Sequence, residues 1–247
     1  MFETFDIPGL YLADSTLLSL YAAGKFTGMV IDMGDGITQF SPIYDAALIE
    51  DKCERINIGG KDITKYMKKI LNKKGYNFEK NSGKMIIRAI KEKACYISLS
   101  KDKVETFEYE LPDGNIVELK EERTKAPEKF IFDFSLILKE GKNIPDICNN
   151  IIQKCDVYLK KDFYNCLILS GGNSMFEGLP ERFTKEIKDL VNESMKEEIK
   201  VIASPERKFT TWIGGSILSS SIDDKWITKT EYKENGSQIV HKQKNIK

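Results

Sequence analysis

Carboxylates and glycines alternate in one short stretch of the chain, TGMVIDMGDGITQF. Asp32 and Asp35 stand beside Gly34 and Gly36, and apolar residues flank the group on both sides. Glycine lets backbone amides approach an anion, whereas carboxylates repel a phosphate unless a divalent cation lies between them. The pattern is typical of a turn that holds a hydrated cation with phosphate. It is equally typical of an ordinary hairpin turn.

A second stretch with glycines, LILSGGNSM, runs from an apolar strand into a turn and a helix. A helix that begins after such a turn favours negative charge at its free amides. No G-K-[ST] follows, so the stretch is not a Walker A loop. Close packing of strand on helix explains Gly171 and Gly172 nearly as well. In a third stretch, SPERKFTTWIGGS, Arg207 and Lys208 could face a ligand, although a surface loop with paired charges is the simpler interpretation.

Apolar periodicity predicts the elements that position these stretches. A short helix ends near Gly24, and a hairpin follows across residues 28–40. Two amphipathic helices come next, in KDITKYMKKILNKKGY and GKMIIRAIKEKACYISL, and we interpret their lysines as a solvated face. The Pro-Asp-Gly of YELPDGNIVEL predicts a second hairpin, with Asp113 as a turn former.

The second half of the chain predicts a helix, then two strand–turn–helix units. DICNNIIQKCDVYLKKDFY is typical of one helix that begins at Asp146. NCLILSGGNSMFEGLPERFTKEIKDLV predicts a buried strand, a glycine turn and a helix. KVIASPERKFTTWIGGSILSS predicts a strand, a polar loop and an apolar helix. The tail after Trp226 is polar, and we expect it to be weakly structured.

Composition excludes several classes of function. Lys plus Arg and Asp plus Glu number 38 each, so no excess charge points to nucleic acid. No apolar run approaches the length of a membrane span. Five scattered cysteines without a C-x-x-C pair fit reduced thiols in a cytosolic compartment. The only histidine, His241, lies in the polar tail, which argues against histidine-based catalysis or a His-rich metal site.

Taken in order along the chain, these stretches resemble actin. The matching segments are MFETF, LSLYAAG, GMVIDMGDGIT, INIGGKDIT, IKEKACYISL, YELPDG, IIQKCDVYLKKDFY, LSGGNSM, SPERKFTTWIGGSIL and EYKENG. The resemblance covers essentially all 247 residues. It implies an α/β fold: one half of the actin-like (ribonuclease H-like) ATPase fold, with an inserted smaller α/β subdomain and a C-terminal helical tail.

The resemblance also implies a division of the chain. Residues 1–24 would be a remnant of the first actin half plus a linker helix. Residues 25–59 and 136–215 would form the core subdomain of the second half, and residues 60–135 the inserted subdomain. Residues 216–247 would form the C-terminal segment that in actins returns to the first half.

Actins hold ATP or ADP with Mg²⁺ in a cleft, and the resemblance carries that site onto named residues. Asp32 would act on Mg²⁺ through water. Phe176 stands where actins usually have tyrosine. The positions that would contact the nucleotide are Gly34, Asp35, Gly36, Gly60, Lys91, Glu92, Gly171, Gly172, Met175, Phe176 and Lys208.

Two departures from the family concern catalysis. Actins place a glutamine beside the attacking water, where this chain has Ser15, and a histidine after the phosphate hairpin, where it has Gln39. Because positioning and polarising that water supplies much of the rate, we expect these altered catalytic positions to slow hydrolysis severely.

A third departure concerns the start of the chain. The D-x-G-[ST]-G hairpin near the actin N-terminus has no match here, and Met1 coincides with an internal methionine of actins. We therefore expect that roughly the N-terminal third of the family's length is lacking and that nucleotide affinity is weak. The apolar face of WIGGSIL and Trp226 would then lose part of its partner. An incomplete gene model of a full actin-like ATPase is the alternative.

Two functions from different classes follow from these observations. The first is a divergent, truncated actin-like protein of the cytoplasmic cytoskeleton, with a partial ATP/ADP-Mg²⁺ cleft and poor hydrolysis. The second is a non-enzymatic interaction module that docks on actin or on actin-binding proteins. We expect neither nucleic acid nor a membrane as a partner.

Overall fold

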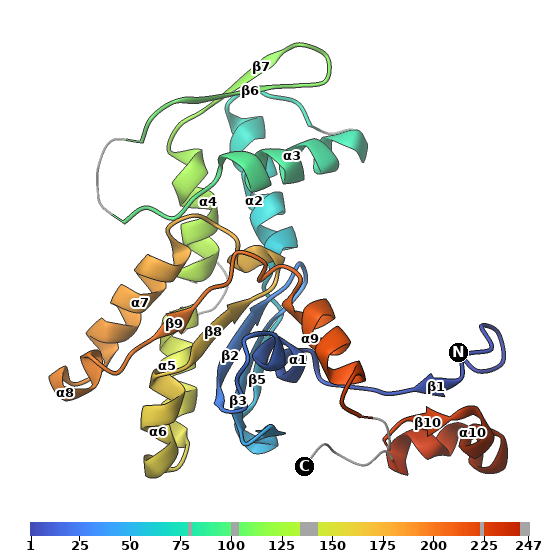
Figure 1. The fold of residues 1–247 in the computed structure, drawn as a ribbon. Coiled ribbons are helices and arrows are strands. Elements are labelled where there is room, and N and C mark those ends of the chain that lie inside the picture. Colours follow the sequence, from blue (N-terminus) through green and yellow to red (C-terminus); the bar gives the residue numbers. More distant parts are fainter. Residues whose placement is uncertain (79–80, 100–103, 134–142, 223–224, 243–247) are drawn as a thin grey trace.

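The computed structural model describes residues 1–78, 81–99, 104–133, 143–222 and 225–242. A mixed β-sheet lies at its centre, with strand order β4-β3-β2-β8-β9 and β5 paired to β3 (Figure 1). The hairpin strands β2 and β3 are antiparallel, whereas β2, β8 and β9 run parallel. The strands are β2 (Gly28–Met33), β3 (Thr38–Tyr44), β4 (Ala47–Leu48), β5 (Glu54–Ile56), β8 (Leu167–Ser170) and β9 (Val201–Ile202). The mixed α/β fold and the predicted hairpin across residues 28–40 are both confirmed.

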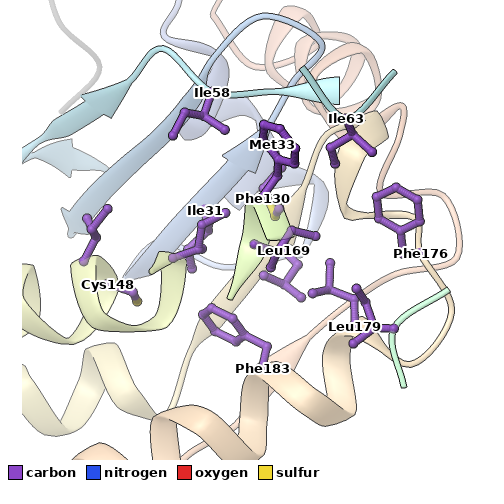
Figure 2. Close-up of a cluster of buried hydrophobic side chains, with 14 of the residues drawn as sticks. Ile31, Met33, Ile58, Ile63, Phe130, Cys148, Leu169, Phe176, Leu179 and Phe183 are labelled. Atoms are coloured by element: carbon purple, nitrogen blue, oxygen red, sulfur yellow. The ribbon is translucent and has the colours of Figure 1, made fainter. Parts of the chain in front are cut away.

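Strand β2 is buried on both faces because helices cover the sheet from both sides. Its side chains alternate as a pleated strand requires. Val30 packs with α1 (Ser15–Ala22) and α9 (Thr210–Ser219) on one face. Met29, Ile31 and Met33 belong to the larger cluster on the other face, with α5, α6 and α7. Figure 2 shows Ile31 and Leu169 of the sheet between Phe183 of α7 and Met33, which lies beside Phe130. The covering helices are α5 (Ile144–Lys154), α6 (Val157–Tyr164), α7 (Leu179–Leu190) and the short α8 (Glu193–Lys196).

A second group of elements extends the larger cluster beyond the sheet. Helices α2 (Gly60–Lys73), α3 (Asn81–Ala94) and α4 (Glu122–Ile131) carry it, beside the hairpin of β6 (Phe107–Glu110) and β7 (Ile116–Leu119) (Figure 1). The predicted apolar face of α2 is Ile63, Met67, Ile70 and Leu71. Three of these residues are fully buried, whereas Ile70 is half-buried. At the hairpin turn the carboxylate of Asp113 accepts a hydrogen bond from the Asn115 amide, as expected of a turn former.

Two sequence predictions of local structure are wrong, and the first concerns the helix after residue 143. The helix predicted from Asp146 onward is two helices, because Cys155 adopts an extended backbone between α5 and α6. The break allows both Ile151 of α5 and Phe163 of α6 to be fully buried.

The tail after Trp226 is ordered, contrary to expectation. Strand β10 (Ile227–Thr228) pairs antiparallel with β1 (Gly9–Leu10), and a capping box at Thr228 begins α10 (Lys229–Asn235). A 3₁₀ segment, η4 (Gly236–Lys242), follows. Short polar elements of this kind carry little periodicity, and a strand from the opposite end of the chain supplies the pairing.

The expected loss of a partner on the C-terminal apolar face is only partly found. Trp212 and Ile217 of α9 are exposed, with 76% and 49% of their surface accessible. Trp226, in contrast, packs edge-on against Tyr11 with ring centroids 6.4 Å apart. It also lies against Gly9, so the strand pair β1–β10 covers it. All five cysteines are free thiols, and all but Cys53 are buried.

Candidate functional site

The turn between β2 and β3 is joined to the N-terminus of α2. The amide of Gly60 donates to the carbonyl of Gly34 at 3.0 Å, and the amide of Lys61 donates to the carbonyl of Asp35 at 2.8 Å. A Cβ on Gly59 would lie 2.5 Å from the Asp35 carbonyl oxygen, so only glycine allows this approach. The turn, the helix N-terminus and its amides therefore form one rigid unit.

A cavity of about 370 Å³ opens beside this unit, at the carboxyl ends of the parallel strands β2 and β8. The predicted positions in its wall are Gly34, Asp35, Gly60, Lys91, Glu92, Gly172, Met175, Phe176 and Lys208. The wall also contains Arg88, Lys93, Cys95, Asn173 and Glu177, which the sequence did not single out. The predicted residues outside the lining are Ser15, Asp32, Gly36, Gln39 and Gly171.

Asn173 is the most informative of the residues that sequence reasoning missed. Its side chain is 7% exposed, and its Oδ1 has no hydrogen-bond partner among the described residues. A buried carbonyl oxygen without a donor is costly, and such atoms are rare in folded proteins. A donor group of a ligand or a water in the cavity would satisfy it. The pattern LSGGNSM singles out its two glycines instead, because the burial of the Asn173 side chain cannot be predicted from the sequence.

Gly60 leaves room in the wall of the cavity. A Cβ at this position would lie 3.0 Å from Nζ of Lys91 and 3.4 Å from both Oδ1 of Asn173 and Oδ1 of Asp35. One ammonium, one carboxamide and one carboxylate therefore converge where the side chain is absent. This mixture of donors and acceptors fits a polar ligand that offers both kinds of group.

Lys91 is a buried cation, so the solvated-face interpretation is wrong for this residue. It is 5% exposed, and Nζ donates to the carbonyl of Gly60 at 3.0 Å. Burial lowers its pKa, and the nearby charges of Glu92 and Asp35 oppose that shift. Glu92 accepts a hydrogen bond from Arg88 at 2.8 Å, which lowers the pKa of its carboxyl. The cavity wall therefore contains a buried ammonium, that of Lys91, beside the Arg88–Glu92 ion pair.

Asp32 lies behind the turn, in a network of hydroxyl groups. Burial raises its pKa, whereas hydrogen bonds with Ser170 and Ser15 act in the opposite direction. The Ser170 hydroxyl lies 2.9 Å from that of Ser19 and 2.8 Å from that of Thr210, and all three residues are buried. Strands β2 and β8 place Asp32 opposite Ser170 in register. Hydroxyls of α1 and β8 therefore hold this carboxylate, and Thr210 of α9 extends the network through Ser170.

Gly171 and the two altered catalytic positions surround Asp32. Gly171 has φ +86°, and a Cβ there would lie 2.5 Å from Oδ1 of Asp32. Both the backbone conformation and this close contact therefore require glycine. Gln39 pairs with Asp32 across the β2–β3 hairpin. Ser15 begins α1 immediately after its N-cap Asp14. The structure therefore brings Ser15, Gln39 and Asp32 together.

In the loop before α9, the two cations Arg207 and Lys208 have different roles. The guanidinium of Arg207 is buried and donates to the carbonyls of Ser174 and Ser204, so the surface-loop interpretation is wrong for it. Lys208 lines the cavity instead. Arg207 anchors the turn after β8, and that anchoring brings Lys208 to the cavity.

Lys61 is a further cation, which the amphipathic pattern of α2 assigns to its solvated face. Its Nζ lies 3.4 Å from the position that a Cβ on Gly36 would occupy. A positive charge therefore stands over the turn that carries Asp35. Among the described residues, no group of three or more His, Cys, Asp or Glu side chains could hold a metal by itself.

A cavity at the carboxyl ends of parallel strands, next to a helix N-terminus, is characteristic of α/β proteins that bind phosphate-bearing small molecules. Comparison with protein families defines the class more closely, because the model of the family described as Actin matches residues 1–245. The chain belongs to the actin family. The resemblance read from its motifs is therefore confirmed. No helix in the described part of the chain is long and apolar enough to cross a membrane.

Proposed function

We propose that this chain binds ATP or ADP together with Mg²⁺ in the cavity between the β2–β3 turn, α2 and the turn after β8. Members of the actin family generally bind these nucleotides with Mg²⁺. The observation that carries the proposal is the unpartnered, buried Oδ1 of Asn173, which faces Lys91 and Asp35 across the gap at Gly60. Such a set of atoms fits a ligand with hydroxyl, amino and anionic groups.

The proposed roles follow the position of each residue. Lys91, Glu92, Met175, Phe176 and Lys208 would hold the base and the sugar. Asp35 and the backbone around Gly34 and Gly36 would face the phosphates, with Gly60 beside them, although the amides of Gly34 and Gly60 already donate to backbone carbonyls. Gly171 and Gly172 would lie near the base and the sugar.

The ammonium of Lys61 would offset phosphate charge beside the carboxylate of Asp35. Asp32 would hold Mg²⁺ through water, and the ion would neutralise charge between the carboxylates and the phosphates.

Titration with a fluorescent ATP analogue in the presence of Mg²⁺ tests this proposal. Asp35→Ala and Lys208→Ala should each weaken binding. Asp113→Ala removes a carboxylate from the distant, exposed β6–β7 turn and should leave binding unchanged. If the unaltered chain shows no saturable binding, or if Asp113→Ala weakens it as much as Asp35→Ala does, the proposal is wrong.

We further propose that the chain hydrolyses nucleotide poorly and acts in the cytoplasmic cytoskeleton, through actin or actin-binding proteins. Two observations favour poor hydrolysis: a hydrogen bond with Ser15 acts to lower the pKa of Asp32, and Ser15 is not among the residues that line the cavity. Phosphate release over time measures hydrolysis, and Ser15→Gln tests whether restoring the longer amide raises the rate. Co-sedimentation with actin filaments measures docking, and the absence of the chain from the pellet at every concentration would contradict it.

A further inference from the structure

A second concave surface lies along α2, where α4 packs against it. This surface, which we call the α2–α4 groove, has a volume of about 530 Å³. Its lining residues are Asp62, Lys65, Tyr66, Lys69, Ile70, Lys73 and Phe130. Figure 1 shows α4, which carries Phe130, alongside α2. None of these residues lines the cavity described above.

Three lysines follow one edge of the groove at a spacing of four residues. Lys65, Lys69 and Lys73 are exposed and stack one turn apart on α2. Lys65 makes a long ion pair of 3.5 Å with Asp62, whereas Lys69 and Lys73 have no ion pair within the described part of the chain. Like charges at this spacing repel one another and destabilise a helix.

This concentration of charge is local, because the whole chain carries equal numbers of basic and acidic residues. Helix α2 itself contains five lysines and one aspartate. The nearby lysines of α4 are neutralised within their own helix or just beyond it, since Lys125 pairs with Glu121 and Lys129 with Asp133. The unbalanced charge therefore lies along the groove.

The floor of the groove is apolar and recessed between the lysines. Tyr66 and Phe130 pack edge to face, with ring centroids 5.5 Å apart, and Ile70 lies half-buried beside them. Phe130 is only 8% exposed, so its ring offers no free face for stacking. The floor can accept an aliphatic side chain but not a flat base.

We propose that the α2–α4 groove docks a short acidic segment of a protein partner, which places carboxylates on Lys65, Lys69 and Lys73 and an aliphatic side chain on Ile70 and Tyr66. The complementary charge on the partner would remove the repulsion along α2. A helix with glutamates four residues apart matches the spacing of the lysines. Nucleic acid fits less well because the ring of Phe130 is buried, and a membrane fits less well because Tyr66 and Ile70 are only half-exposed.

Fluorescence anisotropy with a labelled helical peptide as long as α2 tests the proposal. The probe carries Glu at every fourth position with Leu on the same face, and a matched peptide carries Gln in place of Glu. The full-length chain should bind the acidic peptide, the Gln peptide should bind far more weakly, and added salt should reduce the difference.

The decisive variant is Lys69→Glu combined with Lys73→Glu. Reversing two charges at the edge of an interface should lower the affinity for the acidic peptide by about tenfold. The control combines Lys84→Glu with Lys185→Glu, which makes the same change in net charge at exposed lysines outside the groove. Ile70→Ser should weaken binding without changing its dependence on salt. Circular dichroism establishes that each variant is folded.

Each outcome decides for or against the groove. Loss of binding in the groove variant, with binding retained in the control, supports the proposal. Equal loss of peptide binding in both variants would show that binding depends only on net charge, and it would overturn the proposal. The proposal is also overturned if the unaltered chain does not bind the acidic peptide. It is overturned as well if oligouridylate or phosphatidylserine vesicles bind the groove more tightly than the peptide does.

Discussion

Two adjacent glycines of α9 should respond in opposite directions to the same substitution. A Cβ on Gly214 would lie 1.8 Å from the carbonyl oxygen of Leu18 in α1. A Cβ on Gly215 would meet only the terminal Cδ1 of Leu18, at an ordinary 3.8 Å. Helices α1 and α9 cross at this point, so the first substitution forces backbone against backbone and the second does not.

The size of the effect follows from that geometry. A carbon–oxygen contact needs about 3.3 Å, so Gly214→Ala must move the helices apart by roughly 1.5 Å, the difference from 1.8 Å. Overpacking of this kind costs about 3 kcal/mol, and the better helix propensity of alanine returns about 1 kcal/mol. The net loss of about 2 kcal/mol lowers the melting temperature by about 4–8 °C in a chain of this size. Gly215→Ala keeps the propensity gain alone and should raise the melting temperature by about 2–4 °C.

Differential scanning fluorimetry of the two variants beside the unaltered chain measures both shifts. Because α1 carries Ser15 and α9 carries Thr210, Gly214→Ala should also disturb the hydroxyl network at Asp32. If Gly214→Ala is as stable as Gly215→Ala, the close approach of α9 to α1 does not exist in solution and the reasoning fails.

Three further predictions concern the start of α1 and the cavity. Asp14→Ala removes the cap that accepts hydrogen bonds from the amides of Thr16 and Leu17; chemical denaturation should show a loss of about 1 kcal/mol, and no loss would contradict the cap. Asn173→Ala should raise the melting temperature without nucleotide, because it removes a buried acceptor, but weaken binding of the fluorescent ATP analogue; unchanged binding would refute a ligand role. Burial lowers the pKa of Lys91, so nucleotide affinity should decline at alkaline pH, below the range where an exposed lysine titrates. Lys91→Gln should bind more weakly and lack that decline, and an identical pH profile in both proteins would exclude Lys91.

Much of the fold could be predicted because local patterns are strong where the chain is buried in a regular way. Alternation in GMVID and GITQF predicts the hairpin, and the spacing of Ile63, Met67 and Leu71 predicts α2. The break at Cys155 could not be predicted, because apolar residues continue through it at nearly helical spacing. The strand pair β1–β10 could not be predicted either, since its two members come from opposite ends of the chain.

The candidate site divides in the same way. Glycine and carboxylate patterns single out Asp32, Asp35 and Gly171, because turn geometry and chemical type are local properties. Burial is a property of the whole fold, so the sequence does not show that Lys91 and Asn173 are enclosed while Glu92 stays exposed.

By itself the sequence determined the family, the central hairpin, the strand–turn–helix unit of β8 and α7, and the kinds of groups available for chemistry, since these depend on residue type and spacing. Only the tertiary structure decided which groups meet. It placed Asp32 among hydroxyls from three elements and Asp35 in the cavity wall. It also left Lys69 and Lys73 of α2 along a groove without an ion pair to any described residue. The physical reason is that distance and desolvation, which set the strength of a charge or a hydrogen bond, arise from contacts between segments remote in the chain.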